Sequence, residues 1–313
     1  MKISLPALFS AAFFFAPWAL ADERLAPTHA DVPYDEHERT KIDFWKAEGE
    51  GPRPLLVYIH GGGWTGGDKS KSGPAYEVFL EKGISCAAVN YRLAPDDPLP
   101  APVHDAARAI QFLRYKADEW NIRADRIVLT GGSAGACTSM WILCHDDLAD
   151  PDSTDPVARE STRVQGAFVS GGQTSIDPPQ IEKWLGPMVL QHRMVNLAVG
   201  ERTIEDAIAN YDEHEKIYKE FSAYNHVSED DPPLLMTYGS RYDPTVEKRG
   251  TRHSPSRLRR EDEGEVRQNR AGVPLADPGG IRITKICQRQ RVRFRHSPRR
   301  ESAVGYDSTG LGG

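Results

Sequence analysis

Residues 126–144 read RIVLTGGSAGACTSMWILC, and this stretch decides the fold. Its apolar first five residues predict a strand, and its last eight, small and apolar, predict a helix. Between them Ser133 stands at the apex of a Gly-x-Ser-x-Gly turn framed by Gly131 and Gly135. Such a turn strains the serine backbone and leaves no room for flanking side chains. The hydroxyl group is then held at the start of a helix whose free N–H groups favour negative charge.

A second glycine motif lies upstream of this turn. The run His60, Gly61, Gly62, Gly63 and Trp64 directly follows an apolar strand segment. Three consecutive glycines after a strand let main-chain N–H groups turn inward to meet an oxyanion. Each motif alone could be an ordinary glycine turn or loop. Together, in this order and with strand and helix signals around them, they predict a nucleophilic serine and its oxyanion hole.

Residues 90–95, NYRLAP, lie between the two motifs. With the three motifs in this order, the chain resembles the α/β-hydrolase esterases and lipases of the hormone-sensitive-lipase-like type, from about Asp31 to Pro244. The resemblance implies an α/β fold with a mostly parallel central sheet, helices on both faces and a small helical insertion. The chain departs from the pattern at Gly132, which precedes the serine where many relatives carry an acidic residue.

The resemblance also assigns roles at the site. Ser133 would be the nucleophile, and the N–H groups of Gly62, Gly63 and Ala134 would hold the oxyanion. The glycines that let the backbones approach, and His60 in the loop, would support this arrangement structurally.

Asp243 is the candidate acid of the triad. In this fold the acid follows the strand after the serine and precedes the catalytic histidine in the chain. Residues 232–239 predict that strand, and Asp243 comes a few residues later. The alternative is a solvated turn aspartate before Pro244.

Strand and helix signals alternate along the chain, which predicts a parallel sheet covered by helices. Residues 31–46 predict a strand pair or an edge segment, and residues 176–224 predict helices that form either an insertion over the active site or a plain connecting pair. The expected strands are 55–59, 84–90, 125–129, 164–170 and 232–239, and the expected helices are 76–82, 102–120 and 137–144.

Length and composition fit one α/β domain of ordinary size, with 313 residues and a formal charge of −6. Four cysteines make no disulfide scaffold, and Cys86, Cys137 and Cys144 are expected to pack inside the protein. No cysteine or histidine spacing is typical of a zinc site. We therefore expect no metal and no cofactor, a small-molecule ester as partner, and no nucleic acid.

Residues 1–21 predict a cleavable secretory signal. Lys2 precedes a mostly apolar stretch, and the segment ends in Ala19-Leu20-Ala21 before two acidic residues. Pro6 and Pro17 interrupt the stretch, and it is short for a stable anchor. The expectation is export to the periplasm or the medium, with an uncleaved anchor as the alternative.

The composition changes abruptly after residue 248. Residues 249–300 hold fourteen arginines against a single lysine, and neither helical nor strand periodicity persists. The expected domains are therefore the signal at 1–21, a C-terminally incomplete hydrolase domain at 22–248, and an arginine-rich, disordered tail at 249–313. Such a tail could bind anionic partners, or it could be translated out of frame.

Back-translation favours the second interpretation. With suitable codons, a one-base shift turns residues 288–296 into an apolar helix and residues 251–259 into a segment with two histidines, which resembles relatives. Codon choice can manufacture apolar runs, so the frameshift near residues 244–250 is a hypothesis. His253 and His296 are the histidines that follow Asp243, and neither follows a convincing strand, so the catalytic base stays unknown, with His253 a weak candidate.

The sequence thus predicts an exported serine carboxylic-ester hydrolase that acts through an acyl-enzyme on short-chain or carbohydrate-linked esters. The alternative is an impaired or inactive hydrolase-like protein that lacks a placed catalytic histidine.

Overall fold

The computed structural model describes residues 25–70, 73–238 and 281–283. The expected signal segment 1–21 lies outside these residues. The described strands are β1 (His29–Pro33), β2 (Lys41–Trp45), β3 (Arg53–Ile59), β4 (Ser85–Val89), β5 (Ile122–Gly132), β6 (Gly166–Ser170), β7 (Leu234–Thr237) and β8 (Ile281–Ile283). The described helices are α1 (Tyr76–Leu80), α2 (Ala101–Tyr115), α3 (Ala117–Trp120), α4 (Ala134–Cys144), α5 (Pro178–Leu185), α6 (Met194–Leu197), α7 (Ile204–Ala209) and α8 (Tyr211–Glu220), with 3-10 turns η1 (Pro187–Gln191) and η2 (Ala223–Asn225).

The strands form one sheet in the order β1-β2-β4-β3-β5-β6-β7-β8. The five strands from β4 to β7 in this order run parallel, and β1, β2 and β8 add antiparallel pairs at the edges. The mostly parallel sheet predicted from the alternating pattern is therefore confirmed, as is the strand pair expected within residues 31–46.

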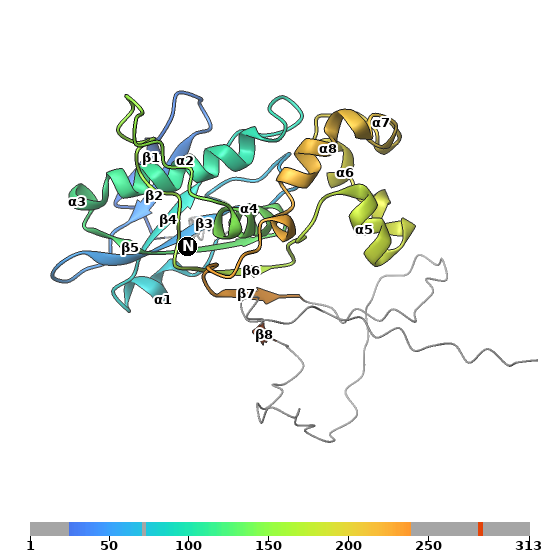
Figure 1. Cartoon of the computed structure of the whole chain (residues 1–313). Helices are drawn as coiled ribbons and strands as arrows, with labels where there is room; N and C mark the ends of the chain where they lie inside the picture. The colour runs from blue at the N-terminus through green and yellow to red at the C-terminus, as the bar shows by residue number, and fades with distance from the viewer. Residues whose placement is uncertain (1–24, 71–72, 239–280, 284–313) are drawn as a thin grey trace, which may run out of the picture.

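Helices cover the sheet on both sides, with α2, α3 and α4 on one face and α1 on the other (Figure 1). Strand β3 explains why both faces need a cover, because successive side chains of a strand point to opposite faces of the sheet. Val57 and Ile59 belong to the large core under α2 and α4, whereas Leu56 and Tyr58 pack with the smaller cluster that includes side chains of α1. Burial on both faces requires apolar residues at every position, which accounts for the continuous apolar run of β3 in the sequence.

The helix expected over residues 102–120 is two helices. The chain leaves the helical region at Lys116, where ψ is 2°. Trp120 then packs its ring against Phe44 and Phe112, with centroids 4.8 and 5.9 Å away. Burial of this indole draws α3 onto the core, a tertiary contact that helical periodicity alone does not reveal.

Residues 176–224 are helical, as expected, and contain α5 to α8 with two 3-10 turns. This group lies beyond one end of the sheet (Figure 1), so it is more than a plain connecting pair. Among the residues with described structure, every helix is too short or too polar to cross a lipid bilayer.

Within the expected tail, the described residues Ile281–Ile283 form β8 and pair antiparallel with β7. The physical reason is that β7 otherwise offers an edge, and an open strand edge is a template for pairing. The rest of residues 249–313 lies outside the described structure.

Candidate active site

Ser133 occupies the turn from β5 to α4 with φ 53° and ψ −123°. A positive φ is strained for a residue with a side chain, and such strain persists where the surrounding structure enforces it. The serine is exposed, while the residues of α4 that follow it are buried. The turn therefore presents the hydroxyl group at the surface from a rigid, buried helix.

The glycines around the serine are required by close backbone contacts. A Cβ atom at Gly131 would lie 2.6 Å from the carbonyl oxygen of Ile59, and one at Gly135 would overlap the same oxygen. The register of the sheet explains this crowding, since Ile59 of β3 pairs with Gly131 of β5. Only glycine lets the turn pack so tightly against the end of β3.

The glycine loop after β3 lies against the serine turn. A Cβ atom at Gly61 would lie 2.5 Å from the carbonyl oxygen of Gly132 and 3.4 Å from the Ser133 Cβ atom. The next two residues, Gly62 and Gly63, have φ values of 115° and 63°, which side chains disfavour. The two motifs that the sequence separates by about 70 residues thus meet in space.

Three main-chain donors are available at this junction. Within the described part of the chain, the N–H groups of Gly62, Gly63 and Ala134 have no hydrogen-bond acceptor. Ala134 is the first residue of α4, where helical N–H groups lack an internal partner. Main-chain N–H groups without an internal partner are the kind of donor that stabilises a negative oxygen atom.

Trp64 fastens the far end of the glycine loop to the serine helix. Its buried indole N–H donates to the Thr138 hydroxyl group of α4 at 3.0 Å. Trp64 also has a positive φ of 60°, which this anchoring helps to enforce. The loop and the helix are therefore held as one unit.

His60 is fully buried at the base of the loop. Its Nδ1 atom lies 2.8 Å from the Gly61 carbonyl oxygen, which requires the proton to be on Nδ1. Burial lowers the pKa of His60, so the ring is neutral near pH 7. The buried ring, with its Nδ1 proton directed at the Gly61 carbonyl oxygen, supports the start of the loop.

Arg39 is a support that the sequence did not reveal. Its guanidinium group donates to the carbonyl oxygens of Tyr91 and Gly67, at 2.9 and 3.1 Å. It thereby joins the segment after β4 to the end of the glycine loop. No motif surrounds Arg39 in the sequence, so only the fold marks it.

A second support is a polar cluster below the loop. The amide of Asn90 donates to Asp68 and accepts from the Lys69 main chain, at 2.8 and 2.6 Å. Burial opposes ionisation of Asp68, but hydrogen bonds from Ser70 and Asn90 outweigh it and lower the pKa to about 2. The Lys69 ammonium group in turn pairs with Asp31 and Asp43.

The neighbours His104 and Asp105 have separate structural partners. Asp105 is buried and receives a bidentate pair from the Arg92 guanidinium group, at 2.7 and 2.9 Å. His104 packs near Trp141 of α4, and burial lowers its pKa. The Arg92 in the NYRLAP stretch thus anchors the start of α2.

Asp243 and His253 lie outside the described residues. The strand before Asp243 is described, and its last residue Thr237 pairs with Ser170, which pairs with Gly132. Strand β7 therefore ends at the same edge of the sheet as the serine turn.

The BD-FAE family model matches residues 42–256, more than half of the chain. The chain belongs to the BD-FAE family. The match includes both glycine motifs, which build the serine turn and the loop beside it, and it also includes β7.

Two curated relatives come from Mycobacterium tuberculosis. The protein named "Probable carboxylic ester hydrolase LipM" is 30% identical over 216 residues, 67% of this chain and 47% of the relative. The protein named "Esterase LipQ" is 26% identical over 258 residues, 81% of this chain and 57% of the relative. This chain spans roughly half the length of these two relatives.

Solved structures show the same fold. An acetyl ester-xyloside bifunctional hydrolase from Caldicellulosiruptor lactoaceticus matches with a TM-score of 0.53 and 24% identity, over 68% of this chain and 75% of that one. A truncated carbohydrate esterase from gut microbiota matches with a TM-score of 0.53 and 20% identity, over 70% and 78%. The expected α/β-hydrolase fold is confirmed.

Proposed function

We propose that this chain is a serine carboxylic-ester hydrolase that works through an acyl-enzyme. One observation carries the proposal: the exposed Ser133, at φ 53°, stands against the glycine loop where Gly61 approaches the Ser133 Cβ position. Family membership and the esterases among the relatives support it. The strain at Ser133 is typical of a nucleophile presented on a sharp turn.

In the proposed reaction, the Ser133 oxygen attacks the ester carbonyl carbon as a general base takes the hydroxyl proton. The carbonyl oxygen becomes negative and is held by the N–H groups of Gly62, Gly63 and Ala134. The base returns the proton to the leaving alcohol, and the acyl group stays on Ser133. Water then attacks the acyl-enzyme and releases the acid.

The acid and the base of the proposed triad are assigned from the sequence alone. Asp243 is the proposed acid, and the base is a histidine downstream of it, for which His253 is the weak candidate. If residues after about 244–250 are out of frame, the chain lacks its base. That gives the second candidate function, a hydrolase-like protein with impaired or no activity.

A fluorophosphonate probe and a chromogenic ester separate these two candidates. The active enzyme is expected to become labelled on Ser133, located by mass spectrometry, and to hydrolyse p-nitrophenyl acetate. The Ser133→Ala variant should lose both properties while it keeps its unfolding temperature. A folded wild-type chain that shows neither labelling nor hydrolysis would establish the inactive candidate instead.

The reading frame is tested on the nucleotide sequence. We expect a single shift near codons 244–250 to give an open frame whose product contains a histidine after a predicted strand. Expression of that product should raise ester hydrolysis above the level of the present chain. An alternative frame interrupted by stop codons would end the frameshift hypothesis.

Short-chain or carbohydrate-linked esters are the proposed substrates, supported by the carbohydrate esterase and the acetyl ester-xyloside hydrolase among the similar structures. Acetylated xylo-oligosaccharides and p-nitrophenyl esters of increasing acyl length test this proposal. Export is proposed from residues 1–21. It predicts a mature N-terminus at Asp22 on protein recovered outside the cytoplasm.

A further inference from the structure

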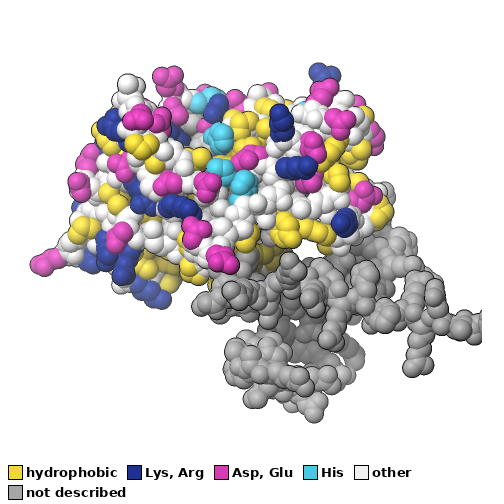
Figure 2. All heavy atoms as spheres, viewed as in Figure 1, with side chains coloured by type: hydrophobic (Ala, Val, Ile, Leu, Met, Phe, Trp, Pro, Cys, Tyr) yellow, Lys and Arg dark blue, Asp and Glu magenta, His cyan; other side chains and the backbone are white. Residues whose placement is uncertain are grey.

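Three potential metal ligands meet on the helical side of the molecule. Each of His145, Glu220 and His226 offers one nitrogen or oxygen atom, and these atoms all lie within 4.8 Å of one another. In the space-filling view, histidine side chains gather near the centre of this face beside acidic groups (Figure 2). We propose that His145, Glu220 and His226 bind one divalent metal ion of the zinc class.

The donor spacing fits such an ion. The Glu220 Oε1 atom lies 3.0 Å from the His145 Nε2 atom and 3.7 Å from the His226 Nε2 atom. Ligands of a tetrahedral zinc ion at about 2.0–2.1 Å are about 3.3 Å apart, which these two separations bracket. Two imidazoles and one carboxylate are donors that zinc prefers.

His145 is already oriented as a ligand. Its Nδ1 atom lies 2.8 Å from the Asp146 carbonyl oxygen, so the proton on Nδ1 is donated there. Its Nε2 atom donates to the Glu220 carboxylate at 3.0 Å, and a metal ion bound between the two would replace that proton, which leaves to solvent. Main-chain carbonyls commonly fix metal-binding histidines through the second ring nitrogen in this way. The His145 ring also packs on Trp141, with centroids 4.2 Å apart, which restricts its rotation.

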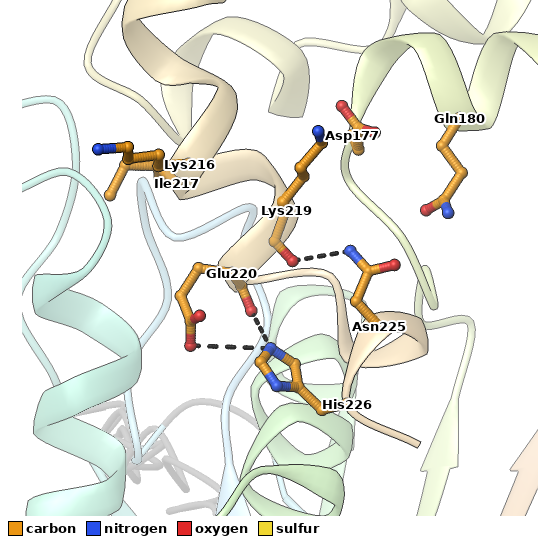
Figure 3. A pocket seen from close by; sticks show the side chains of 8 residues that line it. All are labelled: Asp177, Gln180, Lys216, Ile217, Lys219, Glu220, Asn225 and His226. Atoms are coloured by element: carbon orange, nitrogen blue, oxygen red, sulfur yellow. Dashed lines mark hydrogen bonds and ion pairs between the residues drawn. The ribbon is translucent and has the colours of Figure 1, made fainter. Parts of the chain in front are cut away.

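His226 reaches the same carboxylate from the next segment. In the structure its Nε2 atom lies 2.5 Å from the main-chain carbonyl oxygen of Glu220 (Figure 3). Metal binding requires this ring to present a lone pair, so the proton on Nε2 moves to Nδ1 through solvent and the ring stays neutral. The ion then replaces one hydrogen bond with a coordinate bond.

The local field favours a cation here. His145 follows the last residue of α4, and Glu220 is the last residue of α8, so the C-terminal ends of two helices converge. The partial negative charge of a helix C-terminus stabilises positive charge. Helix α4 has no basic residue in its last turn, and Lys219 of α8 is engaged by Glu215 at 2.6 Å.

The site is accessible to an ion. Glu220 and His226 line one end of a hollow of about 720 Å³ beside α8 (Figure 3). The three side chains are between 19% and 41% exposed. Water from the hollow can supply the remaining ligand.

The position indicates a structural role. Ser133 and His145 flank α4 at its two ends, and at about 1.5 Å per residue they lie about 18 Å apart along the helix. The ion would tie the serine helix to α8 of the helical group. It would therefore stabilise that group and take no part in ester chemistry.

Calorimetric titration of the full chain with zinc chloride tests the site. We expect one equivalent to bind, and the unfolding temperature to rise by roughly 5–10 °C at a hundredfold excess over the Kd. Cobalt(II) should give the visible absorption of a tetrahedral site. Ser133→Ala should bind zinc as the wild type does, which separates this proposal from the proposed catalysis.

Variants locate the ion. Glu220→Gln, which keeps the side-chain volume, and His226→Gln should each weaken zinc binding at least tenfold, as should His145→Ala. The matched controls are His37→Ala, an accessible histidine elsewhere, and His253→Ala with His296→Ala, which remove ligands outside the described residues. Zinc binding that survives in Glu220→Gln and His226→Gln, or is lost only with the tail histidines, would overturn the assignment, as would a wild type without a zinc equivalent.

Discussion

Tyr91 and His60 are joined twice. Their rings stack with centroids 4.2 Å apart, and the Tyr91 hydroxyl group donates to the His60 carbonyl oxygen at 2.7 Å. Both residues are fully buried, and burial raises the pKa of Tyr91 far above its usual range, so the hydroxyl group keeps its proton. This contact explains why the NYRLAP stretch accompanies the glycine loop. Through Tyr91, the NYRLAP stretch fixes the direction in which the glycine loop leaves the sheet at His60.

Tyr91→Phe should keep the ring stacking and lose the hydrogen bond. The His60 carbonyl oxygen then loses a buried donor, which costs about 1–3 kcal/mol of unfolding free energy. Because the glycine loop begins at His60, ester hydrolysis should fall mainly in kcat. Urea unfolding and steady-state kinetics measure the two effects. Tyr115→Phe, at an exposed tyrosine, is the control and should change neither.

Gly62→Ala should damage the proposed oxyanion hole. Gly62 has φ 115°, and an added Cβ atom would overlap the Gly66 carbonyl oxygen, so the loop must shift. Loss of one oxyanion donor lowers kcat by roughly 10²–10³-fold. The matched control is Gly66→Ala in the same loop, where an added Cβ atom meets nothing within 4 Å. Equal kcat values for the two variants would contradict the assignment of Gly62.

Gly135→Ala should destabilise the fold itself. The new methyl group would overlap the Ile59 carbonyl oxygen and crowd that of His60, both of them rigid main-chain atoms. Overpacking of this kind costs about 1–3 kcal/mol or more, measured by chemical unfolding. Gly132→Ala is the comparison, because its nearest neighbour is the Ser170 hydroxyl oxygen at 3.3 Å, and we expect a smaller loss.

Asp105→Ala should remove the anchor of the NYRLAP stretch. It leaves the Arg92 guanidinium group without its bidentate partner, and breaking a buried pair costs about 3–5 kcal/mol. Arg92 is 33% exposed, so we expect roughly 2–3 kcal/mol after solvent screening. Asp125→Ala, which breaks the exposed pair with Arg123, should leave the unfolding temperature nearly unchanged in the same thermal unfolding assay.

Because of Asp68, the free energy of unfolding should decrease as the pH falls. Its folded pKa of about 2 lies below the ordinary 3.8, so the unfolded state takes up the proton first as the pH falls. The stabilisation is present above about pH 4 and is lost between about pH 4 and 2. Asp68→Asn should cost about 1 kcal/mol at pH 7, after allowance for solvent screening, and progressively less at pH 4 and 3.

Urea unfolding of wild type and variant at each pH measures this difference. Asp96→Asn, at an exposed carboxylate, serves as the control. A constant difference in unfolding free energy between wild type and Asp68→Asn from pH 7 to pH 3 would show that the Asp68 charge does not stabilise the cluster.

The sequence by itself determined the serine turn and the glycine loop. Both depend on unusual torsion angles and close backbone contacts, such as φ 53° at Ser133 and the crowding at Gly135. Such positions require glycine or a special turn, so the types of a few consecutive residues are enough to predict them. The same holds for the buried strand β3, whose apolar run covers both faces. Local chemistry left few alternatives at these positions.

Only the tertiary structure decided which distant residues meet. Arg39 reaches Tyr91 and Gly67, and His145 meets Glu220 across 75 residues of chain, because parallel strands and packed helices bring separate segments to one place. No spacing of residue types encodes such a contact. The sequence therefore predicted no metal ligands at His145 and His226, and the fold places them beside one carboxylate.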